Sequence, residues 1–232
     1  MGAQWKQKSK TENASAKGRI FGKLVKEIMV AAKAGPDPEK NARLRVAVEQ
    51  AKKASMPRDT LERAIKKGAG LLDEQVHYDV VTYEGFGPHQ VPVMVECLTD
   101  NKTRTAANIR MIFRRGQLAS EGAVSWDFKH QGVVEAAPPP SGADAETAAI
   151  EAGAQELEPA EDGATRFFTE AADLDLVTRA LAAQKWTVQA SQLAWRAKNP
   201  MKLEAGPHAE VERFLEALDE DDDVQNIYVA LS

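Results

Sequence analysis

Lysine and arginine side chains are concentrated at the beginning of this 232-residue chain. Residues 1–70 contain 17 Lys and Arg against 7 Asp and Glu, which gives them a charge of +10. Residues 71–135 contain 6 against 9, and residues 136–232 contain 7 against 19, so the formal net charge is -5. Because Lys and Arg neutralise phosphates and release counterions, the cationic end predicts binding to nucleic acid despite the negative total.

One aromatic residue stands among these cations. Trp5 is surrounded by lysines, and an indole ring beside ammonium groups is the combination that binds unpaired bases. For any single lysine, a solvated helix face is the alternative, and lysines in a last helical turn can simply complement the helix dipole. The predicted nucleic-acid-binding residues are Trp5, Lys6, Lys8, Lys10, Lys17, Arg19, Lys23, Lys26, Arg45, Lys52, Lys53, Arg58, Lys66 and Lys67.

Residues able to perform catalysis do not occur in recognisable patterns. The four histidines are dispersed without metal-ligand spacing: His77, His89, His130 and His208. The single cysteine, Cys97, lies in an apolar stretch, which predicts a buried, inert thiol and excludes an intrachain disulfide. No hydrolase, metalloprotease or P-loop motif occurs, and Gly85-Phe86-Gly87 is typical of a hairpin turn rather than a nucleotide-binding loop.

The acidic run 219–223 has clustered carboxylates but lacks the spacing and the glycine turn of a calcium loop. It predicts a solvated loop, which could also repel nucleic acid from the wrong face of the protein or contact the basic end of the chain. A metal-dependent nuclease using Asp100 or Asp219 is the enzymatic alternative. We therefore expect a protein that is not an enzyme, with no catalytic residue, no metal, no cofactor and no small-molecule substrate.

The first 70 residues are expected to form three short helices after a mobile basic arm at residues 1–15. Apolar residues recur every three or four positions in 16–34 and 39–54, and a third helix follows Pro57 and ends at Gly68. Pro and Gly separate these segments. Three amphipathic helices joined by tight turns predict a small helical bundle.

After Gly70 the pattern becomes mixed α and β. Strands are expected at 78–83, 91–98 and 124–128, with a helix at 102–115. The next elements have the order βαββαβ of a ferredoxin-like unit, at 132–136, 144–153, 155–158, 165–169, 173–184 and 186–194. A helix at 208–218 and a strand at 224–231 are too few to fold alone, so we expect them to complete the earlier sheet.

The predicted fold class is therefore α+β with three domains. Residues 1–76 form the basic arm and the helical bundle, and residues 77–130 and 205–232 form a discontinuous α/β domain. Residues 131–204 form a ferredoxin-like domain inserted into it. No apolar run has the length of a membrane span, and the lysine-rich start is unlike a secretory signal. We expect a cytoplasmic protein without a membrane partner.

Several long stretches resemble the YebC/PmpR family, most strongly over residues 1–130. They are Ile20–Ile28, Asn41–Arg45, Met56–Gly68, Tyr83–Pro88 and Glu96–Thr105. The family resemblance implies a cytoplasmic bacterial protein with a helical first domain and two α/β domains, the third inserted in the second. The chain departs from the family by lacking the histidines usual near the start, and by carrying Arg58 where lysine is more usual.

The resemblance implies a non-enzymatic regulator of gene expression that binds DNA, like the probable transcriptional regulators of the family. The alternative is a ribosome-associated translation factor that binds ribosomal RNA and eases synthesis of proline-rich stretches. The sequence shows no clear helix-turn-helix signature, which mildly favours an RNA role that reads backbone or shape. A protein-interaction adaptor, in which the acidic half holds a basic partner, is the third possibility.

Overall fold

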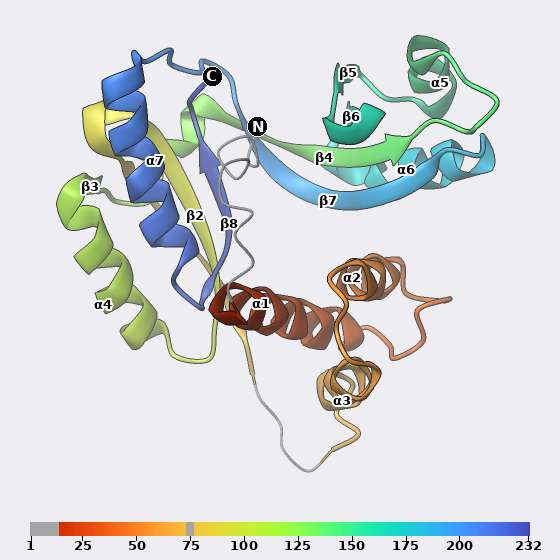
Figure 1. Ribbon diagram of the computed structural model, residues 1–232, viewed down its shortest axis with the longest axis horizontal. Helices are drawn as coiled ribbons and strands as arrows, with labels where there is room; N and C mark the ends of the chain where they lie inside the picture. The colour runs from red at the N-terminus through yellow and green to blue at the C-terminus, as the bar shows by residue number, and fades with distance from the viewer. Residues whose placement is uncertain (1–13, 73–76) are drawn as a thin grey trace. The chain divides into compact units, whose positions relative to one another are not determined.

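The computed structural model describes residues 14–72 and 77–232 (Figure 1). The helices are α1 (Ala14–Ala32), α2 (Ala42–Lys53), α3 (Arg58–Gly68), α4 (Lys102–Ile112), α5 (Ala145–Ala152), α6 (Leu174–Ala183) and α7 (Ala205–Asp219). The strands are β1 (Asp79–Phe86), β2 (Pro92–Thr99), β3 (Gln117–Leu118), β4 (Phe128–Ala137), β5 (Glu156–Pro159), β6 (Thr165–Thr169), β7 (Thr187–Ala197) and β8 (Val224–Val229). Within the described residues, no helix is both long and apolar enough to cross a membrane.

The predicted α+β class is confirmed: a helical region is followed by two regions of mixed helices and strands, each with one four-stranded sheet. The chain divides into two compact units, one containing His130–Trp195 and the other containing the residues before and after it. The predicted domain boundaries at 76, 130 and 204 stay predictions. The arm expected at 1–15 lies outside the described residues as far as residue 13, and Ala14 already belongs to α1.

The three N-terminal helices share one apolar core. Apolar residues of α1 and α2 at helical spacing are buried with Leu61 and Ala64 of α3. Asn41 caps α2 by accepting from the backbone N–H of Leu44. Its amide also donates to the carbonyls of Ala31 and Gly35 at the end of α1. One buried amide thus joins the end of the first helix to the start of the second.

Helices α1 and α3 approach each other closely at Gly68. A Cβ atom at Gly68 would lie 2.3 Å from the carbonyl oxygen of Met29. That distance is shorter than any ordinary contact and involves backbone, which cannot move aside cheaply. The absence of a side chain at Gly68 therefore permits this helix crossing.

The first sheet has the strand order β3-β1-β2-β8. Its strands pair antiparallel, with Tyr83 opposite Val95 in β1 and β2. Helices α4 and α7 cover one face, where Phe113 and Phe214 meet edge to face at 5.1 Å between ring centroids. As expected, the C-terminal helix and strand complete the sheet begun by residues 79–99.

The strand expected at 124–128 is wrong. Ser125–Asp127 form a short 3-10 turn, and β4 begins only at Phe128. The alternating apolar pattern does not reflect a strand because Trp126 is 68% exposed while Val124 is buried. Buried Glu84 accepts hydrogen bonds from backbone N–H groups of this segment, which bends it away from an extended form.

The second sheet has the strand order β5-β6-β4-β7 and lies in the compact unit His130–Trp195. Its elements follow the predicted order βαββαβ, and α5 and α6 contribute to the same core as Phe167 and Val134. Strand β4 enters this unit and its neighbour β7 leaves it. Adjacent entering and leaving strands are the arrangement that an inserted domain requires.

Candidate nucleic-acid interface

The predicted binding residues lie on several elements. Those of the arm, Trp5, Lys6, Lys8 and Lys10, lie outside the described residues. The others belong to three helices: Lys17, Arg19, Lys23 and Lys26 to α1, Arg45, Lys52 and Lys53 to α2, and Arg58, Lys66 and Lys67 to α3. The structure thus assigns one group of cations to each helix of the bundle.

The cations along α1 face carboxylates of this same chain. Lys23 Nζ donates to the Asp219 side chain at 2.9 Å and to the Asp219 carbonyl at 2.7 Å. One turn earlier, Arg19 lies 3.7 Å from Glu220. These contacts show that the acidic run 219–223 occupies the α1 surface on which phosphate binding was expected.

Lys26 makes the most buried of these contacts. Its ammonium donates to Asp223 Oδ1 at 2.7 Å and to the Asp222 carbonyl at 2.8 Å. The Lys26 and Asp223 side chains retain only 15% and 3% of their exposure. The pair lies largely out of water, so Lys26 contributes to docking α1 rather than to an open phosphate-binding surface.

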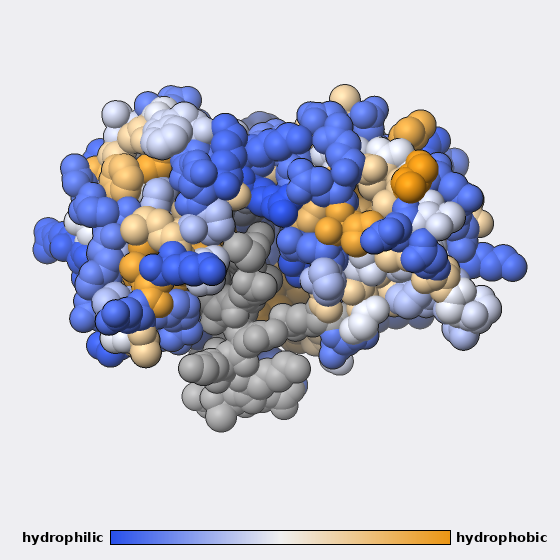
Figure 2. Space-filling view, turned by 90° about the horizontal axis from the view of Figure 1, so that it is seen from above, coloured by the Kyte–Doolittle hydropathy of each residue, from blue (hydrophilic) through white to orange (hydrophobic). Residues whose placement is uncertain are grey.

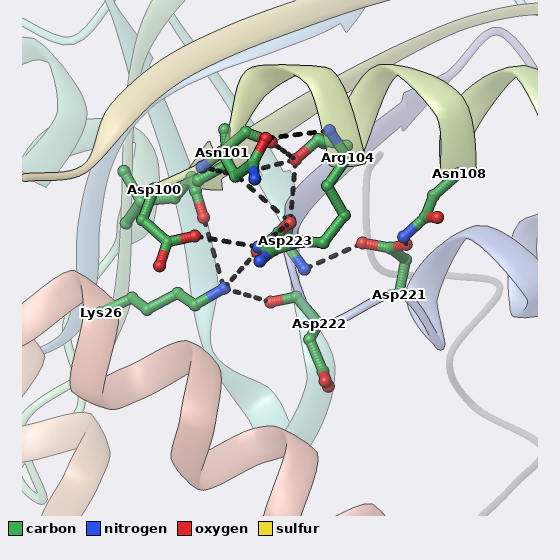
Figure 3. Close-up of polar contacts among 11 residues, drawn as sticks. Lys26, Asp100, Asn101, Arg104, Asn108, Asp221, Asp222 and Asp223 are labelled. Carbon is green, nitrogen blue, oxygen red and sulfur yellow. Dashed lines mark hydrogen bonds and ion pairs between the residues drawn. The ribbon is translucent and has the colours of Figure 1, made fainter.

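Helix α4 supplies further partners of Asp223 (Figure 3), and the Thr99 hydroxyl of β2 donates to Asp223 Oδ2 at 3.3 Å. Arg104 donates to Asp223 Oδ2 at 2.8 Å and to Asp100 at 3.0 Å. The Thr105 hydroxyl also donates to Asp223, at 2.8 Å. Asn108, one turn further along α4, donates to Asp221 at 2.9 Å. We call Lys26, Arg104, Thr105 and Asp223 the Asp223 network.

The Asp223 network fixes the charge of its central carboxylate. Burial by itself would raise the pKa of Asp223, but hydrogen bonds from Lys26, Arg104 and Thr105 outweigh it and lower the pKa to about 2. The carboxylate is therefore ionised throughout the neutral range. It joins α1, α4 and the segment before β8 by charged hydrogen bonds.

A hollow of about 860 Å³ opens beside this network. Cations and carboxylates both line it. The aromatic ring of Tyr78 and Gly22 of α1, which has no side chain, also form part of the lining. Such mixed charge does not favour a polyanion. Among residues 14–72 and 77–232, no cluster of His, Cys, Asp and Glu could hold a metal ion.

Helices α2 and α3 present their cations differently. Arg45, Lys52, Lys53 and Lys66 are exposed, and no ion pair joins them to a carboxylate in the described part of the chain. Lys17 of α1 shares these properties. Arg58 instead pairs with Glu62 at 2.7 Å, one turn along α3. The unpaired cations form the candidate nucleic-acid interface.

Two further cations share these properties but were missing from the sequence prediction. Lys33 and Arg63 are exposed, and neither has an ion pair within the described ranges. Their signal in the sequence was their position: Lys33 directly follows α1, and Arg63 lies outside the apolar stripe of α3. Lys67, by contrast, is partly buried and has an interaction partner.

The sulfur of Cys97 is not a candidate nucleophile. Cys97 is 1% exposed, and burial, followed by the nearby Asp221 and Asp223 charges, raises the pKa of its thiol to about 12. At neutral pH almost no thiolate forms, and thiolate is the reactive species.

Comparison with known proteins identifies the fold and the family together. The sequence profile of the TACO1/YebC protein N-terminal domain matches residues 1–71, and that of the TACO1/YebC second and third domain matches residues 78–231. The chain belongs to the TACO1/YebC family. The resemblance found in the motifs is confirmed.

Relatives within the TACO1/YebC family cover the whole chain. A protein of Pseudomonas syringae pv. syringae is 62% identical over 233 residues, and one of Bdellovibrio bacteriovorus is 48% identical over 234 residues, each covering 100% of both chains. Both carry the name "Probable transcriptional regulatory protein". The crystal structure of a conserved hypothetical protein from Aquifex aeolicus is similar, with a TM-score of 0.82 and 36% identity, covering 97% and 94% of the two chains.

Proposed function

We propose that this protein is a non-enzymatic, cytoplasmic regulator of gene expression that binds nucleic acid through its helical bundle. The observation that carries the proposal is the set of exposed, unpaired cations on the bundle, set against the acidic remainder of the chain. The regulatory names of its relatives support the same function.

The acidic run changes which cations are proposed to contact phosphate. Arg19, Lys23 and Lys26 hold the bundle to residues 219–223, so they are not proposed as binding residues. The proposed surface comprises the basic arm, including Trp5, together with Lys17, Lys33, Arg45, Lys52, Lys53, Arg63 and Lys66. Glu49 is also exposed on α2 and weakens the positive potential there.

A pair of matched variants tests this surface. Lys52→Gln with Lys53→Gln removes two charges from α2, while Lys185→Gln with Lys202→Gln removes two exposed charges from the acidic remainder. Binding of labelled DNA and RNA duplexes is followed by fluorescence anisotropy over a series of salt concentrations. The α2 variant is expected to bind more weakly and to flatten the log–log salt slope by about 1.8, at about 0.9 per duplex phosphate contact.

Equal effects of the two pairs would contradict a surface on the bundle. A wild-type chain that binds neither DNA nor RNA would remove the proposal altogether. Incubation of both nucleic acids with Mg²⁺ should leave them uncut, since a nuclease would cleave them.

The kind of nucleic acid is decided by crosslinking in cells and identifying the bound molecules. Promoter DNA would support transcriptional regulation, while ribosomal RNA, with the protein sedimenting alongside ribosomes, would support a role in translation. A protein complex that survives nuclease treatment, with no nucleic acid crosslinked, would favour the interaction adaptor.

A further inference from the structure

Trp126 is a large apolar side chain held at the surface of the first α/β domain. It is 68% exposed, whereas Trp186 is 4% exposed and packs against Phe167 in the second core. The Trp126 indole Nε1 donates to the Ala123 carbonyl at 3.0 Å. The single donor of the ring is therefore already used, and its exposed part can interact only as an aromatic surface.

The loop that carries Trp126 is fixed by a buried carboxylate. Glu84 is 6% exposed and accepts the backbone N–H groups of Gly122, Val124 and Ser125 at 2.8–2.9 Å. Burial by itself would raise the pKa of Glu84, but these hydrogen bonds outweigh it and lower the pKa. The charge is thus satisfied by the loop backbone, which holds the residues before the ring in one conformation.

The residues on the other side of the ring are held by the segment after β7. Lys198 Nζ donates to the Trp126 carbonyl at 2.6 Å, and the Lys198 backbone N–H donates to the Asp127 carbonyl at 2.8 Å. Asn199 donates to the Asp127 carboxylate at 2.6 Å. These contacts fix the backbone of Trp126 and place an ammonium group beside it, while the Asp127 charge is 5% exposed.

More cations precede the loop at the same sheet edge. Arg114 and Arg115 are exposed, and neither forms an ion pair within residues 14–72 and 77–232. Gln117 then pairs with Phe86 of β1, and the Ala119 N–H bonds to the Glu84 carbonyl. Two residues of strand advance the chain by roughly 7 Å, so the arginines and the Glu84-bound segment flank one short stretch of β1.

We propose that Trp126 stacks on an unpaired nucleobase of a single-stranded nucleic acid, with Arg114, Arg115 and Lys198 contacting the adjacent phosphates. A fixed aromatic surface together with cations that contact the backbone is the combination that binds single strands without base-specific hydrogen bonds. A cationic protein segment could also stack on indole, but the three cations would repel it. The inference rests on the proposed function and adds a second site, outside the helical bundle.

Val124 and Phe128, the apolar neighbours of Trp126 in the chain, are buried, so the exposed apolar surface of this loop comes from the Trp126 ring. The face of the molecule drawn in Figure 2 is mostly hydrophilic, with apolar areas between polar side chains. A single ring among charged groups suits one stacked base better than the broad apolar core of a stable protein interface.

The test compares Trp126→Ala with Trp126→Phe and with Leu176→Ala, a control that truncates another residue, 60% exposed. Labelled uridine and thymidine oligomers and blunt duplexes of equal length are titrated by fluorescence anisotropy. Trp126→Ala should weaken single-strand binding by about 5- to 150-fold, the range for one stacked base, and leave duplex binding unchanged. Trp126→Phe should lose less single-strand affinity than Trp126→Ala, and Leu176→Ala should lose none.

Charge variants test the phosphate contacts. Arg114→Gln with Arg115→Gln should flatten the single-strand salt slope by about 1.4, at about 0.7 per contact. Polyglutamate, which has charges but no bases, should compete poorly for the site. Strong competition by polyglutamate that depends on Trp126 would overturn the inference in favour of an acidic protein partner.

The remaining outcomes separate this inference from the proposed function. Wild-type binding to single strands that is unchanged in Trp126→Ala, or an equal loss for single strands and duplexes, would overturn the stacking site alone. A wild-type chain that binds duplexes but not single strands would also overturn the stacking site alone. A wild-type chain that binds neither form would overturn both proposals.

Discussion

At the residue scale, Asp223 shows how one carboxylate can be both buried and charged. It is 2% exposed and receives hydrogen bonds from two cations and two hydroxyls. The acidic run was expected to be a solvated loop, with contact to the basic end as one of the alternatives. The structure realises that contact because the run lies where α1 and α4 both supply donors.

The Asp223 network predicts a loss of stability in acid. Above about pH 4, Asp223 is ionised in both the folded and the unfolded chain, so its contribution is complete. As the pH falls from about 4 to 2, the unfolded chain takes up the proton first, because the folded pKa is lowered to about 2. The free energy of unfolding should fall by about 2 kcal/mol over this window.

Asp223→Asn should remove this part of the pH dependence and lower the free energy of unfolding at pH 7 by about 2–4 kcal/mol, because the largely buried Lys26 and the exposed Arg104 lose their shared carboxylate. The matched control is Asp222→Asn, an exposed neighbour whose carboxylate points away from Lys26 (Figure 3). Urea unfolding at a series of pH values measures both. Equal losses in the two variants would show that the network adds no stability of its own.

Cys97 should be unreactive in the folded chain. Its thiol is buried, and its pKa is raised to about 12, so thiolate is scarce at neutral pH. Ellman's reagent should label it only after urea is added, at the rate of unfolding. Rapid labelling of the native chain would show that β2 opens or that the thiol is accessible.

At the scale of elements, periodicity located the helices well because each buries a stripe against a core. The main error was the strand predicted at 124–128. The alternation of apolar residues there is local, whereas the conformation is set by Glu84, which is distant in sequence. Val124 and Phe128 are buried and Trp126 is exposed, so alternation in sequence did not match alternation in burial. The backbone N–H groups of this segment donate to Glu84, which lies 40 residues away in sequence, and these hydrogen bonds decide its conformation. No local pattern in the sequence signals them.

The crossing of α1 and α3 yields a prediction with its own control. Gly68→Ala would place a methyl group against the Met29 backbone and should lower the free energy of unfolding by at least 1 kcal/mol. Gly18→Ala on α1 meets no atom within 4 Å and should raise it by up to about 1 kcal/mol, the helix preference of Ala over Gly. Chemical denaturation of both variants, compared with wild type, measures the difference. Stabilisation by both substitutions would mean that the two helices can move apart freely.

At the scale of the whole molecule, the charge asymmetry was readable from the sequence, but its internal pairing was not. Sequence shows how many cations the bundle has. Only the fold shows that Arg19, Lys23 and Lys26 meet carboxylates about 200 residues later, whereas Lys52 and Lys53 do not. The candidate interface therefore shifts from α1 toward α2 and α3, while the predicted role of the arm is untested.

The inserted unit should fold without the remainder of the chain. Residues 128–197 include β4 through β7 and a core of their own around Phe167 and Leu181. Expressed alone, this fragment should unfold in a single cooperative transition, followed by circular dichroism and by the fluorescence of its two tryptophans, Trp195 and Trp186, of which Trp186 packs on Phe167. A fragment with no cooperative transition would show that the insertion depends on its host domain.

The two kinds of cation in the bundle should respond differently to electrolyte. The Debye length is about 8 Å at physiological ionic strength, so salt screens interactions between exposed charges, but it screens buried pairs far less. Lys26 lies in a buried pair with Asp223, whereas Lys52 and Lys53 are exposed. A rise in ionic strength would therefore release a bound polyanion while leaving α1 attached to the segment before β8. On the proposed function, nucleic acid would therefore exchange as the ionic strength varies, while the contact between Lys26 and Asp223 persists.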